Sequence, residues 1–526
     1  MEGITSLDLS IIGIYFVTVL GIGLYIARST KTGEDLFLGG RTFGWGLIGL
    51  SLFASNISSS TIIGLSGAAY STGIVQSVYE WMSGIPLIIA ALVFVPLYLN
   101  SRITTIPEFL ERRFDKRSQQ FFSLITIFIS IIVDTAGGLY AGALVLQTFF
   151  PDLILWQTCF VLALIAGLYT AFGGLKAVVY TDAIQAIILI LGCSILTYML
   201  FEQLDFSWDT VVASAPEGHF SIVRPLSDTS LPWPGLFLGV PILGFWYWST
   251  NQYIVQRILG GRNIQQARWG VILAGFLKII PLFIMVIPGA MAISLFPDLG
   301  NQDAVFPTIV VEVLPAGLVG LVLAGLISAI MSSVDSTLNS ASTLIVVDFI
   351  KPAKERNNKS MSPEETAKYG RISTIILMVV AASWAPMIEN FEGLWAYLQQ
   401  MFAIVVPPIA AIFLLGVFYK RGNAEGAFWT LLIGTVLGTV VFLLGQYEMW
   451  PIHFTINVGI MLAISCLIFI GVSNQTAEPP REKIENYTFK KSMIAEGMEN
   501  VPFYQDYRLH MALLLGLIVY IFIVFF

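Results

Sequence analysis

The chain has 526 residues, of which 56% are apolar and only 12% charged, with a net charge of -7, three cysteines and three histidines. This charged fraction is about half of what soluble domains carry, so the composition excludes a soluble globular protein of this length. The scattered histidines and cysteines lack metal-ligand spacing, and the chain has no phosphate-binding glycine loop and no basic, aromatic-interleaved stretch for nucleic acid.

Apolar runs long enough to cross a hydrocarbon core of about 30 Å recur along the whole chain. We predict fourteen membrane spans, at residues 7–28, 45–73, 78–100, 119–149, 155–173, 176–201, 232–257, 269–296, 314–347, 368–388, 393–418, 424–446, 452–473 and 508–526. The longest stretches outside them, 202–231 and 474–507, are too short for a core of their own. Residues 1–526 are therefore expected to form a single transmembrane domain.

Positive charge alternates between successive loops. One set of alternate loops carries most of the Lys and Arg residues, within 28–41, 102–117, 257–268, 351–359, 420–421 and 481–491, whereas Arg224 is the main exception in the other set. The positive-inside rule makes the first set cytoplasmic. With fourteen spans, both termini then face the periplasm or the exterior. We expect a multi-pass protein of the plasma membrane, which in a bacterium is the inner membrane.

Two predicted spans contain residues that interrupt a helix. The second span has seven small or polar residues in the eight of 54–61, and the seventh contains Pro234, Gly235, Gly239, Pro241 and Gly244. The second span opens a set of five spans at 45–201, and the seventh opens another set of five at 232–418. This is the layout of two inverted five-helix repeats with a binding site at their broken helices. Residues 1–44 are then an extra N-terminal helix and loop, and 419–526 are peripheral helices. A Ser/Gly-rich packing face explains the same residues equally well.

Charged residues occur at membrane depth, where they are costly and usually functional. They are Glu80, Asp134, Asp182, Lys278 and Asp335. Four carboxylates and one ammonium predict an interior that attracts cations, and oxygen ligands suit a hard ion. In the ninth span, Ser332, Asp335 and Ser336 are spaced i, i+3, i+4 and share one helix face. This face is a candidate sodium-ligand set.

Short strings in a fixed order carry a family resemblance. They are Ser51–Ile57, Tyr79–Trp81, Gly173–Asp182, Leu231–Gly235, Trp246–Trp248, Asn251–Arg257, Asn339–Thr343 and Pro407–Leu415. Together they resemble the solute:sodium symporters, and within them the sodium/glucose and sodium/myo-inositol cotransporter branch, from about residue 8 to the C-terminus. The resemblance implies an all-α, leucine-transporter-type fold with extra helices, and a transporter rather than an enzyme.

The resemblance also implies where one or two sodium ions bind. The first site has the backbone carbonyls of Ala54, Ile57 and Ala329 with the hydroxyls of Ser332 and Ser333; back-bonding of the two serines to their own helix is the alternative. The second has Asp182, Asp335 and Ser336. Two carboxylates at one site repel unless a cation lies between them or one is protonated. A second sodium is favoured, while proton binding and an Asp335 that points elsewhere stay open.

The solute pocket implied by the resemblance is polar and gated by aromatic residues. It consists of Asn56, Thr61, Glu80, Ser83, Tyr247, Trp248, Lys278, Trp395 and Gln399. Tyr247 resembles an inner gate and Trp395 an outer gate, although ordinary helix packing explains any single aromatic. Three positions, Thr61, Gly244 and Asp134, depart from the pattern of the family. The first two make the pocket larger and less polar, which leaves the particular sugar open.

These observations predict secondary active symport, in which the inward sodium gradient drives uptake of a neutral sugar or polyol of the hexose or myo-inositol class by alternating access. The alternatives are an amino-acid or carboxylate solute, and a channel or solute sensor on the same fold. An enzyme is disfavoured because the chain offers no His-paired nucleophile and no HExxH-type helix. The expected partners are the solute, sodium and the bilayer, with no nucleic acid and no obligatory protein partner.

Overall fold

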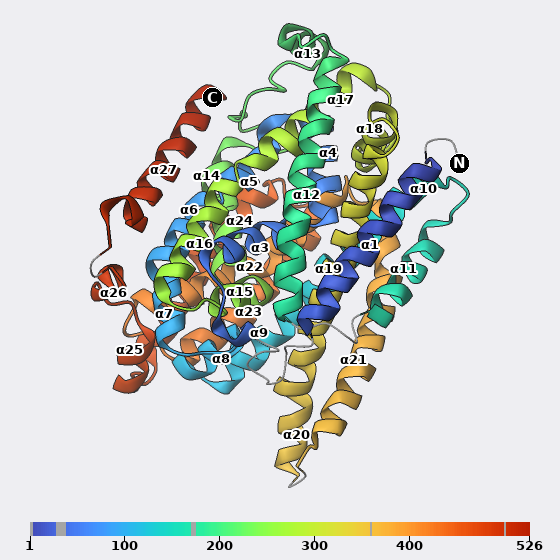
Figure 1. Cartoon of the computed structure of the whole chain (residues 1–526). Coiled ribbons are helices and arrows are strands. Elements are labelled where there is room, and N and C mark those ends of the chain that lie inside the picture. Colours follow the sequence, from blue (N-terminus) through green and yellow to red (C-terminus); the bar gives the residue numbers. More distant parts are fainter. Residues whose placement is uncertain (1–3, 28–37, 170–174, 358–359, 499–500) are drawn as a thin grey trace.

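The computed structural model describes residues 4–27, 38–169, 175–357, 360–498 and 501–526, and the regular structure in them is helical apart from two isolated bridges (Figure 1). The longer helices are α1 (Ser6–Ala27), α3 (Trp45–Asn56), α4 (Ser59–Thr72), α9 (Lys116–Phe128), α10 (Ala136–Phe149), α11 (Leu155–Tyr169), α12 (Leu175–Glu202), α14 (Trp233–Ser249), α16 (Ile264–Leu277), α19 (Leu318–Leu344), α21 (Pro363–Trp384), α22 (Leu394–Phe418), α23 (Ala424–Gln446), α24 (Phe454–Gln475) and α27 (Tyr507–Val524).

Shorter helices connect or extend the long ones. They are α5 (Val78–Trp81), α6 (Gly84–Ile89), α7 (Val95–Asn100), α8 (Ile106–Arg113), α13 (Trp208–Ser214), α15 (Gln252–Leu259), α17 (Ile287–Leu295), α18 (Val305–Val313), α20 (Lys351–Arg356), α25 (Arg481–Tyr487) and α26 (Ser492–Ala495). A π-helical turn, η4 (Ile129–Thr135), joins α9 to α10, and a 3-10 turn, η7 (Gln302–Ala304), precedes α18.

The predicted spans all overlap helices in the described residues. By length and composition, nine of these helical segments could cross a membrane, or ten if the bent pair α3 and α4 counts as one span. The apolar stretches found in α1, α11 and α19 are shorter. The multi-span, all-α architecture is therefore confirmed, whereas the number fourteen and the side on which the termini lie stay predictions.

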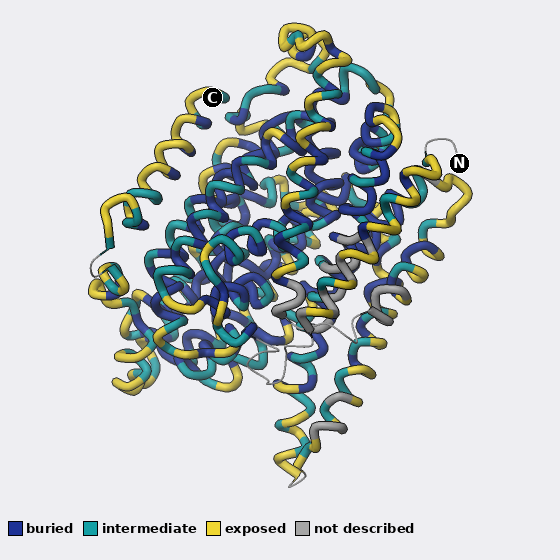
Figure 2. Tube along the Cα trace, viewed as in Figure 1, coloured by how far each residue is buried: buried dark blue, intermediate teal, exposed yellow. Residues whose placement is uncertain are grey.

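Burial separates inner helices from outer ones (Figure 2). In α22, 78% of the most apolar 18-residue window is buried within the protein, against 22% in α27 and 28% in α23. A helix that is apolar all round is stable only inside a protein or in lipid. The inner helices, with α3, α4 and α22 among them, form the core that holds the site, and the outer ones present their apolar side chains outward to lipid.

The predicted interruption of the second span is present. α3 ends at Asn56, α4 begins at Ser59, and the two helices are bent by 60°. The Ser58 hydroxyl accepts a hydrogen bond from the Thr61 N–H and so caps α4, while the Thr61 hydroxyl donates to the Asn56 carbonyl at 2.9 Å. Serine and threonine compete for backbone hydrogen bonds in this way, which is why this stretch stops one helix and starts another.

The interruption predicted at Pro234–Gly244 is wrong. α14 runs unbroken from Trp233 to Ser249, and the chain breaks only at Thr250 and Asn251, before α15. Gly235 and Gly239 instead let α24 approach closely, because a Cβ on either would lie within 3 Å of Thr455 atoms. These glycines form a helix-packing face of the kind that small residues provide in membranes.

Candidate transport site

A cavity lined by both aromatic and polar side chains lies between α3–α4, α5, α14 and α22. We call it the aromatic cavity; its lining includes Tyr79, Trp246, Tyr253 and Phe402, together with eight of the nine residues predicted to contact solute, namely Asn56, Thr61, Glu80, Ser83, Tyr247, Trp248, Trp395 and Gln399. These eight residues come from segments more than 300 positions apart in the sequence. The fold therefore brings the predicted pocket together at one place.

Lys278, the ninth predicted residue, does not line this cavity but contacts residues that do. Its side chain is fully buried, and its ammonium donates hydrogen bonds to the Glu80 carboxylate and the Asn56 side-chain oxygen. The Trp248 ring lies 5.7 Å from the ammonium. Lys278 thus neutralises Glu80 and orients two residues of the lining, and Glu80 in turn neutralises the charge of Lys278.

The two predicted gate residues lie in different parts of the aromatic cavity. Trp395 packs edge-on against Tyr79, with 5.4 Å between the ring centroids. The Tyr247 hydroxyl is hydrogen-bonded to the Tyr253 hydroxyl at 2.8 Å. Tyr253 also lines a second cavity, whereas Trp395 lines only the first. Tyr247 is therefore on the side that faces the second cavity.

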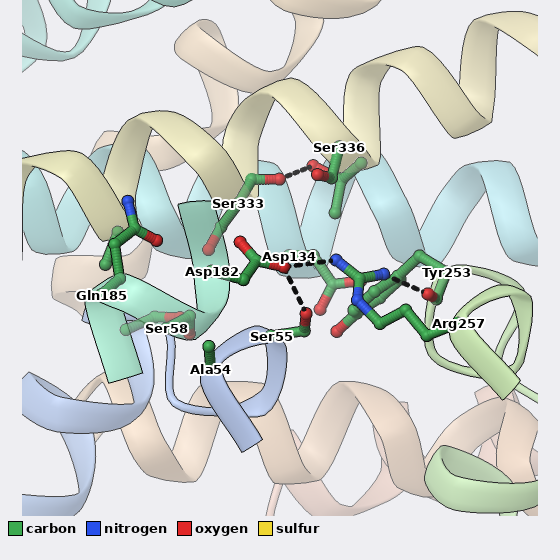
Figure 3. Close-up of a pocket in the computed structure, with 13 residues that line it drawn as sticks. Ala54, Ser55, Ser58, Asp134, Asp182, Gln185, Tyr253, Arg257, Ser333 and Ser336 are labelled. Carbon is green, nitrogen blue, oxygen red and sulfur yellow. Dashed lines mark hydrogen bonds and ion pairs between the residues drawn. The ribbon is translucent and has the colours of Figure 1, made fainter. Parts of the chain in front are cut away.

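The second cavity lies beside the break between α3 and α4, against α12, α15 and α19 (Figure 3). We call it the serine cavity; it is lined by Ala54, Ser55, Ser58, Ser60, Asp134, Asp182, Gln185, Tyr253, Arg257, Ala329, Ser333, Ser336 and Thr337. Ser58, Ser60, Asp134 and Tyr253 line both cavities. The two spaces therefore adjoin.

Residues of both predicted sodium sites surround the serine cavity. Ala54, Ala329 and Ser333 of the first site line it, as do Asp182 and Ser336 of the second. The side chains of Ser332 and Asp335 are outside the described part of the structure. Ile57 does not line the cavity; it is buried at the bend directly after α3, where only its carbonyl would be available to an ion.

The break supplies the carbonyl oxygens that a cation needs. The last carbonyls of a helix have no partner within it. At the end of α3, the carbonyl of Phe53 accepts from the Ile57 N–H and that of Asn56 from the Thr61 hydroxyl. The intervening residues Ala54 and Ser55 both lie at the serine cavity. Carbonyl and hydroxyl oxygens around one space suit a hard cation.

Comparison with known proteins shows which family this chain belongs to. The sodium:solute symporter family model matches residues 36–434. Sodium/glucose cotransporter 1 of Sus scrofa is 35% identical over 82% of this chain and 71% of that protein. Sodium/myo-inositol cotransporter 2 of Homo sapiens is 34% identical over 93% of this chain and 79% of that protein. The chain belongs to the sodium:solute symporter family.

Solved structures agree on the fold. A sodium-coupled sialic acid symporter is 22% identical, with a TM-score of 0.76 over 90% of this chain and 99% of that one. A nucleobase-cation-symport-1 family transporter is 14% identical, with a TM-score of 0.57 over 87% and 99%. The symporter described here thus has the leucine-transporter-type fold expected from its sequence. It is a sodium-coupled membrane transporter.

One residue of the symporter's site was missed by sequence reasoning. Arg257 had been grouped with the cytoplasmic loop charges, but its side chain is 3% exposed and its guanidinium lies 3.1 Å from the Asp182 carboxylate. The hydroxyls of Ser51 and Ser55 donate to the same Asp182 oxygen. Arg257 therefore provides Asp182 with a counter-charge from the protein itself, whereas the sequence analysis considered only a bound sodium or a proton. Its place at the end of Asn251–Arg257, one of the family-like strings, was the available signal.

Proposed function

We propose that this symporter couples the inward sodium gradient to uptake of a neutral sugar or polyol, of the hexose or myo-inositol class, across the plasma membrane by alternating access. The convergence of the predicted solute-binding residues on the aromatic cavity carries the proposal. Ring faces such as those of Tyr247 and Trp248 suit the apolar side of a sugar, and Asn56 and Gln399 can bond its hydroxyls. Buried polar groups that a wrong solute leaves unpaired provide selectivity.

The adjoining cavities support a coupling mechanism. A sodium ion held by Ala54, Ile57, Ala329, Ser332 and Ser333 would bridge the break in α3–α4 to α19. The same break carries Asn56 and Thr61 into the aromatic cavity, so ion binding would order the solute pocket. Loss of the ion to the cytoplasm would free the break and release the solute. Each entering charge contributes about 2.3 kcal/mol per 100 mV of membrane potential.

A second sodium at Asp182, Asp335 and Ser336 is part of the proposal. Arg257 already pairs with Asp182 in this structure, and so the second ion would bind by displacing that guanidinium or by sharing the carboxylate with it. The number of sodium ions that enter per solute, measured as parallel sodium and solute fluxes, decides between one site and two.

The test is uptake in proteoliposomes with and without an inward sodium gradient, using labelled hexoses, myo-inositol, proline and a sugar acid. Sodium-driven accumulation of a hexose or myo-inositol is expected. Ser333→Ala should abolish sodium-dependent uptake while expression is retained, and Ser340→Ala, further along α19 and outside both cavities, is the matched control. Unchanged uptake by Ser333→Ala would refute the first sodium site.

Two other uptake results would favour the alternative functions, a different solute class or a channel. Accumulation of proline or the sugar acid alone would contradict the sugar pocket and leave the fold and the sodium site standing. Purely downhill flux of a solute would favour a channel.

A further inference from the structure

One carboxylate of the aromatic cavity has no partner in the described part of the structure. Asp134 lies in η4, the π-helical turn between α9 and α10, and lines both the aromatic and the serine cavity. Its Oδ2 is buried and accepts no hydrogen bond from any described residue. Insertions of this π-helical kind in α-helices are frequent at functional sites.

Among the side chains that the structure describes, the other charges next to the cavities are compensated. Glu80 is paired with the fully buried Lys278, and Asp182 is paired with Arg257. Each of these pairs is neutral as a unit. Burying an ionised carboxylate without a counter-charge is costly, and a cationic ligand that enters the cavity would remove this cost for Asp134.

The surroundings of Asp134 indicate which cation fits. The aromatic cavity, which Asp134 helps to line, also contains the rings of Tyr79, Trp246 and Trp395. Aromatic faces attract organic ammonium groups, and more strongly where water is excluded. A bare metal cation requires several oxygen ligands instead. On the side of the aromatic cavity these rings add to the attraction of Asp134 for an amine, whereas the hydroxyls of the serine cavity, which Asp134 also lines, suit a sodium ion.

We propose that the aromatic cavity takes a sugar that carries a protonated amine, with Asp134 as the residue that binds the ammonium. The hydroxyls of the sugar are held by the amide side chains of Asn56 and Gln399 on other parts of the lining. The inference rests on the proposed sugar uptake and narrows it: an amino-hexose is preferred to the parent hexose. Acids of similar size are disfavoured, because Glu80 already neutralises the Lys278 ammonium and an ionised Asp134 would repel another carboxylate.

The test compares sodium-dependent uptake of labelled glucosamine, glucose and N-acetylglucosamine in proteoliposomes, at a pH below the pKa of the amine. N-acetylglucosamine retains the nitrogen without its charge. We expect glucosamine to be preferred to glucose by about 10- to 100-fold in kcat/KM, the range that a hydrogen bond to a charged group provides. Asp134→Asn should remove this preference, and Asp303→Asn, outside both cavities, should keep it.

Each other result has a defined meaning. Glucose uptake without a preference for glucosamine would overturn the amine site and leave the proposed function intact, whereas no sodium-dependent uptake of any sugar would refute both. An Asp134→Asn variant that loses glucose and glucosamine equally would show that Asp134 has a structural role. A lower sodium:solute ratio in that variant, with its solute preference unchanged, would show that Asp134 binds sodium. Both results would overturn the proposal.

Discussion

At the scale of single residues, the Glu80–Lys278 pair shows how this symporter keeps charges at membrane depth. Both side chains are almost completely buried, and Asn56 accepts a second hydrogen bond from the ammonium. A buried pair gains little net stability, because desolvation offsets the attraction between its charges. Removing one partner is different, since it leaves the other charge buried and uncompensated.

We therefore expect Lys278→Met to destabilise the protein by about 3–5 kcal/mol. The double variant Glu80→Gln/Lys278→Met, which has no charge left, should recover most of that loss. Thermal unfolding in detergent measures both. If the double variant were as unstable as the sum of its single changes, the two side chains would not be coupled.

Asp303 is a buried carboxylate outside the membrane-spanning segments. Its side chain lies in η7 and accepts a hydrogen bond from the Leu394 N–H at 2.8 Å, so it holds this turn against the first residue of α22, next to Trp395. Burial raises the pKa of Asp303 from 3.8 to about 6, although the Leu394 hydrogen bond acts to lower it. The protonated form thus stabilises the folded protein below about pH 4, and this contribution is lost as the pH rises through 6.

Asp303→Asn retains a hydrogen-bond acceptor and cannot ionise. Relative to this variant, the wild-type protein should lose about 3 kcal/mol of stability between about pH 4 and pH 7.5, because a shift of one pKa unit corresponds to about 1.4 kcal/mol. Melting temperatures of the two proteins across this pH range provide the measurement. Parallel curves would mean that Asp303 keeps one protonation state throughout.

At the scale of elements, α1 caps another helix. The fully buried Asp8 of α1 accepts hydrogen bonds from the N–H groups of Gly317 and Gly320 at the start of α19, at 2.6 and 2.7 Å. A Cβ on Gly320 would lie 2.5 Å from the Asp8 backbone, so the two helices are in close contact. Because α19 carries Ser333, the N-terminal helix helps to position the proposed sodium site.

Asp8→Ala should cost about 1–3 kcal/mol, because two buried N–H groups lose their acceptor. Asp8→Asn, which keeps one oxygen, should cost less. The exposed Ser10→Ala on the same helix is the control. Thermal unfolding measures the loss, and sodium-dependent uptake reports whether α19 has moved. Equal melting temperatures for Asp8→Ala and the control would contradict this cap.

At the scale of the whole molecule, the bundle has two ends of different charge. α13 and α20 lie at opposite ends in Figure 1. The α20 end belongs to the loops rich in Lys and Arg, which the positive-inside rule assigns to the cytoplasm. The inverted repeats 45–201 and 232–418 stay predictions, which the sequence analysis made from the order of the spans and their interrupted helices.

Cysteine labelling tests this orientation. Asp209 in α13 and Glu355 in α20 are exposed, whereas the native Cys159 and Cys193 are buried. In a Cys466→Ser background, Asp209→Cys should react with a membrane-impermeant maleimide in intact cells, and Glu355→Cys only after permeabilisation. The reverse pattern would invert the predicted topology.

Features set by neighbouring residues could be read from the sequence. Long apolar runs predicted the helices, and the Ser-rich stretch 54–61 predicted the break between α3 and α4, because capping and helix interruption are local events. The family resemblance also predicted which residues meet at the aromatic cavity, because each residue was carried over from the matching position of the family.

Contacts between distant segments were decided only by the tertiary structure. The sequence could not show that Arg257 would be buried against Asp182, that Lys278 would stand behind Glu80, or that Asp8 would cap α19, because each of these groups finds its partner more than 70 residues away. The glycines of α14 misled for the same reason: a small residue marks either a break or a close contact, and the approach of α24 decides which. Local propensity determines where helices form, and the packing of helices determines which polar groups are paired and which, like Asp134, remain for a ligand.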